Sequence, residues 1–143
     1  MKINIITPAK KFSKNGNRTT ATRWASILRN LGHKVDITVN YNGQRIDLMI
    51  ALHAWRSAGS ISDYKKISPN GPLIVTLTGT DINSYIHSDP SRTINSMEHA
   101  DFLICLHDLA ADIIPSKFQE KLRVIYQSAI ASNKKKNPSK THF

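Results

Sequence analysis

Short apolar runs recur along the chain, and several are apolar on successive residues instead of alternate ones. Leu48–Leu52 and Leu73–Val75 are the clearest cases. A strand with one face in water alternates apolar and polar residues, whereas a strand covered on both faces is apolar throughout. Six runs are predicted as strands: Lys2–Thr7, Lys34–Asn40, Asp47–His53, Leu73–Leu77, Asp101–Leu106 and Leu122–Tyr126. The pattern therefore predicts a parallel sheet with helices on both faces.

A segment with helical period lies between the first two runs. Its apolar residues recur at the spacing of one helix face: Ala21, Trp24, Ala25, Leu28 and Leu31. We expect Asn17 to cap this helix and Gly32 to end it in the left-handed conformation. Further helices are expected over Ser60–Ile67, Ser91–His99 and Leu109–Ile114. Strand and helix thus alternate, which predicts an α/β domain with a Rossmann-like, doubly wound parallel sheet.

The composition fits one cytoplasmic domain. A chain of 143 residues can bury enough apolar surface to fold without disulfides or metals. The only cysteine, Cys105, lies in an apolar run and is expected to be a small buried hydrophobe, as in a reducing compartment. No run approaches the length of a membrane span. We therefore expect cytoplasmic localisation and no transmembrane segment.

The formal net charge of +10 is unevenly distributed along the chain. The first acidic residue is Asp36, so the N-terminal third of the chain is basic. A second basic cluster lies in residues 134–140. We expect an ordered domain over residues 1–130 and a basic, disordered tail over 131–143. This charge favours anionic partners by long-range steering. Specific nucleic-acid binding is not expected, because no nucleic-acid motif is present; non-specific binding through the basic residues stays an alternative.

Ligands of open α/β sheets bind beyond the carboxyl ends of the strands, so the residues after each strand are candidates for a site. The first strand is followed by Asn15, Gly16, Asn17, Arg18 and Thr19, a loop that leads into a helix. The free N–H groups and positive dipole end of that helix suit an anion, and Arg18 is expected to add a phosphate contact. Neither a G-x-G-x-x-G nor a Walker-type motif is present. The alternative is a simple turn with a solvated arginine.

The third strand is followed by an imidazole, a guanidinium and a hydroxyl, from His53, Arg56 and Ser57. Histidine exchanges protons near neutral pH, and arginine binds phosphoryl groups. The alternative for His53 is a hydrogen-bonded structural role. Trp55 is expected to pack against the protein and not to serve as a stacking platform for a ligand.

The fourth strand is followed by a polar turn that consists of Thr78, Gly79, Thr80 and Asp81. Gly79 can take a positive φ, and Thr80 or Asp81 can cap the next helix. The functional alternative is a hydroxyl or carboxylate that binds a ligand. No group of His, Cys and carboxylate residues has the spacing of metal ligands, so no metal is expected.

Several segments, taken in order, resemble one known family: S-K-N-G-N-R-T-T, L-H-A-W-R-S-A, L-T-G-T-D and V-I-Y-Q-S-A. They look like the N-terminal domain of the selenosugar synthases of selenoneine biosynthesis, relatives of the retaining glycosyltransferases of family four. The resemblance covers the chain from Met1 to about Ala129. It implies a GT-B fold, in which two Rossmann-like domains face a cleft. The first domain holds the acceptor and the second holds most of the sugar nucleotide.

The resemblance also implies the reaction and the residues of its site. Selenophosphate attacks the anomeric carbon of a UDP-N-acetylhexosamine and releases UDP, without a metal or a further cofactor. The residues implied to bind the acceptor or another anion are Asn15, Gly16, Asn17, Arg18, Thr19, Arg56, Ser57, Thr78, Gly79 and Thr80. His53 and Asp81 are the candidate catalytic residues.

In that family a nucleotide-sugar domain follows the V-I-Y-Q-S-A segment. Here residues 131–143 are basic and polar, so we expect the acceptor-side half without its C-terminal partner domain. Such a half is expected to bind its acceptor weakly, to turn over poorly and to self-associate through the exposed domain face. The alternatives are an independent anion- or nucleotide-binding module and a truncated, inactive fragment.

Overall fold

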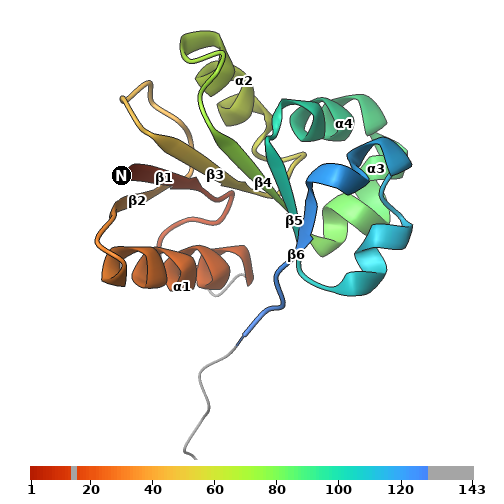
Figure 1. Cartoon of the computed structure of the whole chain (residues 1–143), viewed down its shortest axis with the longest axis horizontal. Helices are drawn as coiled ribbons and strands as arrows, with labels where there is room; N and C mark the ends of the chain where they lie inside the picture. Colours follow the sequence, from red (N-terminus) through yellow and green to blue (C-terminus); the bar gives the residue numbers. More distant parts are fainter. Residues whose placement is uncertain (14–15, 129–143) are drawn as a thin grey trace, which may run out of the picture.

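The computed structural model describes residues 1–13 and 16–128 (Figure 1). Its strands form one sheet in the order β2-β1-β3-β4-β5-β6, and every neighbouring pair is parallel. The bounds are β1 (Lys2–Ile6), β2 (Lys34–Thr38), β3 (Leu48–Leu52), β4 (Leu73–Leu77), β5 (Phe102–Cys105) and β6 (Leu122–Val124). The predicted doubly wound parallel α/β fold is confirmed.

The helices agree with the prediction where they are long. They are α1 (Gly16–Asn30), α2 (Ala58–Ile67), α3 (Ile86–Ser88) and α4 (Pro90–His99). A π-helical turn η1 (Asp81–Tyr85) precedes α3, and two 3₁₀ segments, η2 (Asp108–Asp112) and η3 (Ser116–Lys121), join β5 to β6. The helix expected over Leu109–Ile114 is a 3₁₀ segment over Asp108–Asp112 and not an α-helix.

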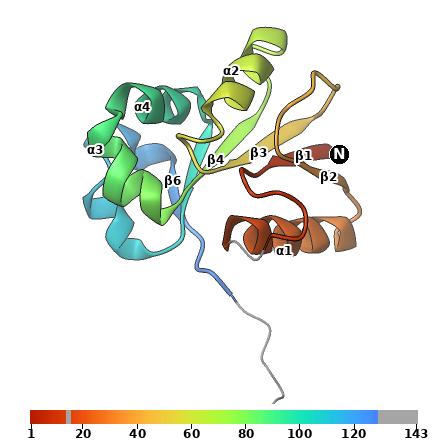
Figure 2. The same ribbon diagram turned by 180° about the vertical axis from the view of Figure 1, so that it is seen from behind.

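Helices cover both faces of the sheet (Figures 1 and 2). α1 packs on one face, where the buried cluster consists of Ile3, Ile5, Ala21, Ala25, Val35, Ile50 and Leu52. α2 and α4 pack on the other face, where the larger cluster includes Met49, Ala51, Ile61, Tyr64, Leu73 and Met97. Residues of β3 alternate between the two clusters, and both clusters exclude water. This explains why β3 is apolar on successive residues.

The two ends of α1 differ in how well the sequence predicts them. Gly32 has φ +90°, which confirms the left-handed stop after this helix. The predicted cap at Asn17 is wrong, because α1 already begins at Gly16 and Asn17 lies in its first turn. Gly16, Asn17, Arg18 and Thr19 are thus helical and do not form a loop. Asn15 and the predicted tail 131–143 lie outside the described residues.

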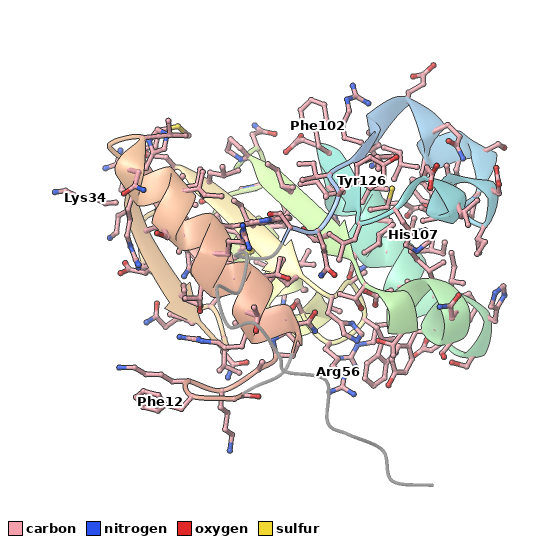
Figure 3. The ribbon with its side chains drawn as sticks, turned by 90° about the horizontal axis from the view of Figure 1, so that it is seen from below. Phe12, Lys34, Arg56, Phe102, His107 and Tyr126 are labelled. Carbon is pink, nitrogen blue, oxygen red and sulfur yellow. The ribbon has the colours of Figure 1, made fainter. Side chains whose placement is uncertain are left out.

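The strand order reverses at β1, which lies between β2 and β3. The connections after β1 and β3 therefore diverge, and doubly wound sheets bind ligands where this happens. Figure 3 shows the two edges of the sheet: Phe12 and Arg56, which follow β1 and β3, lie at one edge, and Lys34 and Phe102 lie at the opposite edge. Within the described residues, no helix has the length and hydropathy of a membrane span.

Candidate functional site

His53 lies directly after β3, at the carboxyl edge of the sheet. Its backbone has φ +75°, a left-handed conformation that is uncommon outside glycine and that turns the chain sharply at the strand end. The side chain is 2% exposed. The imidazole Nδ1 lies 2.7 Å from the Asp81 carboxylate, and Nε2 lies 3.0 Å from the Thr80 hydroxyl. The end of β3 and the turn after β4 therefore meet at this imidazole.

Asp81 is fully buried and accepts hydrogen bonds from both strand ends. Its carboxylate accepts the backbone N–H groups of Ala54 at 2.9 Å, Trp55 at 3.0 Å and Thr78 at 3.0 Å. It also accepts the Thr78 hydroxyl and the imidazole. Burial alone would raise the pKa of the Asp81 carboxyl, but the hydrogen bond and charge of His53 and the N–H groups outweigh it and hold the pKa below its usual value.

The ionised carboxylate determines which ring nitrogen of His53 carries the proton. At 2.7 Å, Nδ1 donates to Asp81, so the neutral imidazole has its lone pair on Nε2. The Thr80 hydroxyl therefore donates to Nε2. The Arg56 backbone N–H also points at Nδ1, at 3.3 Å, but a protonated Nδ1 has no lone pair to accept it, so the shorter contact with the Asp81 carboxylate decides the tautomer. We call the group His53, Thr78, Thr80 and Asp81 the strand-end network; within it, Thr80 is the exposed residue.

Aromatic and ionic contacts hold the strand-end network in place. The Trp55 indole stacks on Tyr85 with 4.2 Å between ring centroids, and its Nε1 donates to Asp89. The Arg92 guanidinium also lies over the Trp55 ring, 4.4 Å from its centroid. Tyr85 also contacts the His53 ring, at 5.6 Å between centroids. Trp55 is thus a packing residue, as predicted.

Arg56 and Ser57, which follow His53, have different surroundings. Ser57 is 3% exposed, and its hydroxyl donates to the Leu52 carbonyl at 2.7 Å, so this side chain stabilises the turn after β3. Arg56 is exposed and lies at the carboxyl edge of the sheet (Figure 3). Of these two predicted binding residues, only Arg56 presents its side chain to a ligand in solution.

A second group of predicted residues lies at α1. The loop after β1, one side of α1 and Ser128 line an open hollow of about 920 Å³, which we call the basic hollow. Its lining consists of Lys11, Phe12, Ser13, Arg18, Thr19, Thr22, Arg23, Ser26, Ile27 and Ser128. Three of these described residues are basic and none is acidic. The Phe12 side chain, 89% exposed, stands beside the hollow on a left-handed backbone with φ 69°.

The predicted residues are thus divided between two places. Arg18 and Thr19 line the basic hollow, whereas His53, Thr78, Thr80 and Asp81 form the strand-end network. Neither His53, Arg56 nor Thr80 is among the lining residues of the basic hollow. Asn15 lies outside the described residues.

Gly79 does not take the positive φ that the turn suggested. Residues 79 and 80 are already helical, and the Asp81 carboxylate accepts the Thr78 N–H three residues back, as in one half of a capping box. This geometry gives Asp81 a capping role in addition to its contact with His53. A glycine at position 79 is therefore not required by backbone conformation.

Sequence reasoning missed several residues of these two places. Lys11, Phe12 and Arg23 line the basic hollow, and Tyr85 and Arg92 support Trp55. The run of basic residues before Asp36 was the available signal for Lys11 and Arg23. No sequence pattern marks Phe12, because its role follows from the left-handed turn at the loop tip.

Within residues 1–13 and 16–128, no three His, Cys, Asp or Glu side chains are grouped as metal ligands would be. His107 and Asp108, after β5, are exposed, and Asp108 accepts the N–H of Leu109.

Comparison with models of known protein families gives no match, and comparison with curated proteins gives none either. We therefore infer function from the geometry of the two places and from the motif resemblance.

Proposed function

We propose that the chain is the acceptor-side half of a GT-B glycosyltransferase similar to the selenosugar synthases. In this proposal the domain holds selenophosphate, which attacks the anomeric carbon of a UDP-N-acetylhexosamine and displaces UDP. The doubly wound sheet supports the fold level of the proposal, although many functions share this architecture. We also infer a cytoplasmic setting, in keeping with the buried, unpaired thiol of Cys105.

The observation that carries the proposal is the charge of the basic hollow. Lys11, Arg18 and Arg23 line it without any acidic neighbour among the described lining residues. Arg18 lies in the first turn of α1, where backbone N–H groups and the positive end of the helix dipole also attract anions. A volume of about 920 Å³ exceeds the needs of one tetrahedral anion and leaves room for part of a second substrate.

The carboxyl edge supplies further groups for the transfer step. Arg56 and Thr80 are exposed there, and the Thr80 hydroxyl contacts the buried His53 imidazole. Exposed guanidinium and hydroxyl groups suit the oxygens of a phosphate or diphosphate. In this proposal catalysis comes mainly from the alignment of the nucleophile and from stabilisation of the departing diphosphate.

Arg18→Ala tests anion binding at the basic hollow. Lys34→Ala is the matched control, because it removes the same charge at the opposite edge of the sheet (Figure 3). We expect calorimetric titration with phosphate and with selenophosphate to show at least roughly tenfold weaker binding for Arg18→Ala, since a charge-assisted hydrogen bond contributes about 1.5–3 kcal/mol. The Lys34 variant should match the original chain. Equal affinities for all three proteins would reject the anion site.

The transfer reaction needs a separate experiment. The chain is incubated with UDP-N-acetylglucosamine and selenophosphate, with and without the C-terminal domain of a selenosugar synthase supplied separately, and UDP release is measured. We expect release above background only in the reconstituted pair. Anion binding without any release would reject the glycosyltransferase and favour a binding module.

The exposed Phe12 ring favours a second candidate function, an anion- or nucleotide-binding module. An aromatic face beside three basic side chains can stack a base while the cations hold its phosphates. This candidate predicts that UMP or AMP binds more tightly than phosphate and that Phe12→Ala removes the difference. Equal affinities for nucleotide and phosphate would count against it.

A further inference from the structure

The hydrogen-bonded groups of the strand-end network follow the order found around an activated hydroxyl. A hydroxyl, an imidazole and a carboxylate follow one another from the surface inward, with 3.0 Å between Thr80 Oγ1 and His53 Nε2 and 2.7 Å between His53 Nδ1 and Asp81 Oδ1. The carboxylate holds the proton on Nδ1, which leaves the Nε2 lone pair facing the hydroxyl. In hydrolases this order lets the imidazole accept the proton of a nucleophile.

The burial of the three groups follows the same order. Asp81 is 0% exposed and His53 is 2% exposed, whereas Thr80 is exposed. Thr80 also lies between the end of β4 and the π-helical turn η1, at a strand-to-helix turn. Such turns present nucleophilic hydroxyls in other α/β folds, and π-helical turns are frequent at functional sites.

The Thr80 hydroxyl is the hydrogen-bond partner of the buried Nε2, and it adds no link between elements beyond those that Asp81 makes. The Asp81 carboxylate already joins the two strand ends through the N–H groups of Ala54, Trp55 and Thr78. Thr80 precedes Asp81 directly in the chain, so its hydrogen bond to His53 connects no further element. The contact instead places an accessible hydroxyl against a buried base.

We propose that Thr80 is a nucleophile activated by the His53–Asp81 pair, and that the domain accepts acyl groups from activated esters on this hydroxyl. Thr80 Oγ1 attacks the ester carbonyl carbon, and its proton moves to His53 Nε2. The carbon–oxygen bond to the leaving alcohol breaks with the bonding electrons on the departing oxygen. The Asp81 carboxylate stabilises the resulting imidazolium, which then returns its proton to the departing oxygen, or to water when the leaving group is a stable phenolate. Water next attacks the carbonyl carbon of the Thr80 ester and gives a proton to Nε2; this proton passes to the Thr80 oxygen as the carbon–oxygen bond breaks, which restores the hydroxyl and releases the carboxylic acid. This proposal does not rest on the proposed glycosyl transfer.

The test uses the full chain and p-nitrophenyl acetate. Release of p-nitrophenolate gives the rate, and mass spectrometry of the intact protein and its peptides locates the acetyl group. Thr80→Val removes the hydroxyl but keeps the shape of the side chain, and Thr80→Ser keeps the hydroxyl. Ser91→Ala, at an exposed hydroxyl in the first turn of α4, is the control. Circular dichroism establishes that each variant is folded.

We expect the acetyl group on residue 80 of the original chain and of Thr80→Ser, and a roughly hundredfold lower rate in Thr80→Val, since general-base assistance is typically of this size or larger. Ser91→Ala should behave as the original chain. Acetylation confined to lysines, or a rate unchanged by Thr80→Val, would overturn the proposal. A folded His53→Gln variant that acetylates Thr80 at the original rate would also overturn the activation by His53.

Discussion

The buried Asp81 carboxylate accepts from five donors that lie in two segments, the turn after β3 and the end of β4. Three of these donors are backbone N–H groups, which can be satisfied by an acceptor only. An asparagine at this position would bring its own N–H donors against them. The carboxylate therefore stabilises the carboxyl ends of β3 and β4, whatever chemistry occurs at Thr80.

We predict that Asp81→Asn lowers the free energy of unfolding by about 3 kcal/mol, because it removes the buried carboxylate that accepts these hydrogen bonds and leaves donors unpaired. Urea unfolding followed by circular dichroism measures the change. Asp63→Asn is the control, since Asp63 is exposed and its pair with Lys66 lies on the surface of α2. This control should change the free energy by less than about 0.5 kcal/mol. A loss of similar size in both variants would contradict the prediction.

The pH dependence of stability provides a second prediction at this scale. Because the pKa of Asp81 is lower in the folded state than in the unfolded state, the folded state binds fewer protons. The stabilisation is fully present above the unfolded pKa of about 3.9 and is lost as pH falls through the folded pKa. The stability difference between the original chain and Asp81→Asn should therefore shrink below about pH 4. Urea unfolding at a series of pH values tests this, and a difference that stays constant with pH would reject it.

His53 and Asp81 show how far residue-level prediction extends. Both are polar residues directly after apolar runs, which marks them as candidates in a parallel sheet. Their contact depends on the parallel register of β3 with β4 and on the left-handed backbone of His53. Neither follows from spacing, so the sequence identifies the residues but not the hydrogen-bond order Thr80, His53, Asp81.

At the scale of elements, strands were easier to predict than short helices. β3 and β4 are buried on both faces, and their continuous apolar runs are sufficient to place them. The segment from Asp81 to Ser88 has no regular apolar period, and η1 and α3 were not predicted. Their conformation depends on tertiary contacts such as the stacking of Tyr85 on Trp55.

The two glycines at the ends of α1 are predicted to respond differently to substitution by alanine. Gly32 has φ +90°, so an alanine there would occupy the left-handed region at a cost of about 1 kcal/mol. Gly16 is helical and a Cβ atom at this position would have no neighbour within 4 Å. We expect Gly32→Ala to destabilise the domain and Gly16→Ala to change the free energy of unfolding by less than about 0.5 kcal/mol. Denaturant unfolding measures both, and equal losses would contradict the assignment of Gly32 as the helix stop.

At the scale of the whole molecule, the alternation of strands and helices predicts the fold class but not the order of the strands. Because β1 and β3 are parallel, the loop after β1 and the turn after β3 lie at the same edge. That edge nevertheless carries two separate groups, because α1 begins at Gly16 and holds Arg18 and Thr19 beside the loop after β1. The described polar residues that follow β1, β3 and β4 therefore do not surround one common hollow.

The net charge of +10 and the basic hollow predict different responses to salt. Binding to an oligonucleotide through scattered Lys and Arg residues releases counterions, so its affinity should fall roughly a thousandfold between about 50 and 200 mM salt. Arg18→Ala and Lys34→Ala remove the same charge and should weaken oligonucleotide binding equally. Binding of phosphate in the basic hollow should instead distinguish them, with loss only in Arg18→Ala. Fluorescence anisotropy with a labelled oligonucleotide and calorimetry with phosphate provide the two measurements. If the two variants lose phosphate affinity to the same extent, phosphate is attracted by the overall charge and not by a defined site at α1.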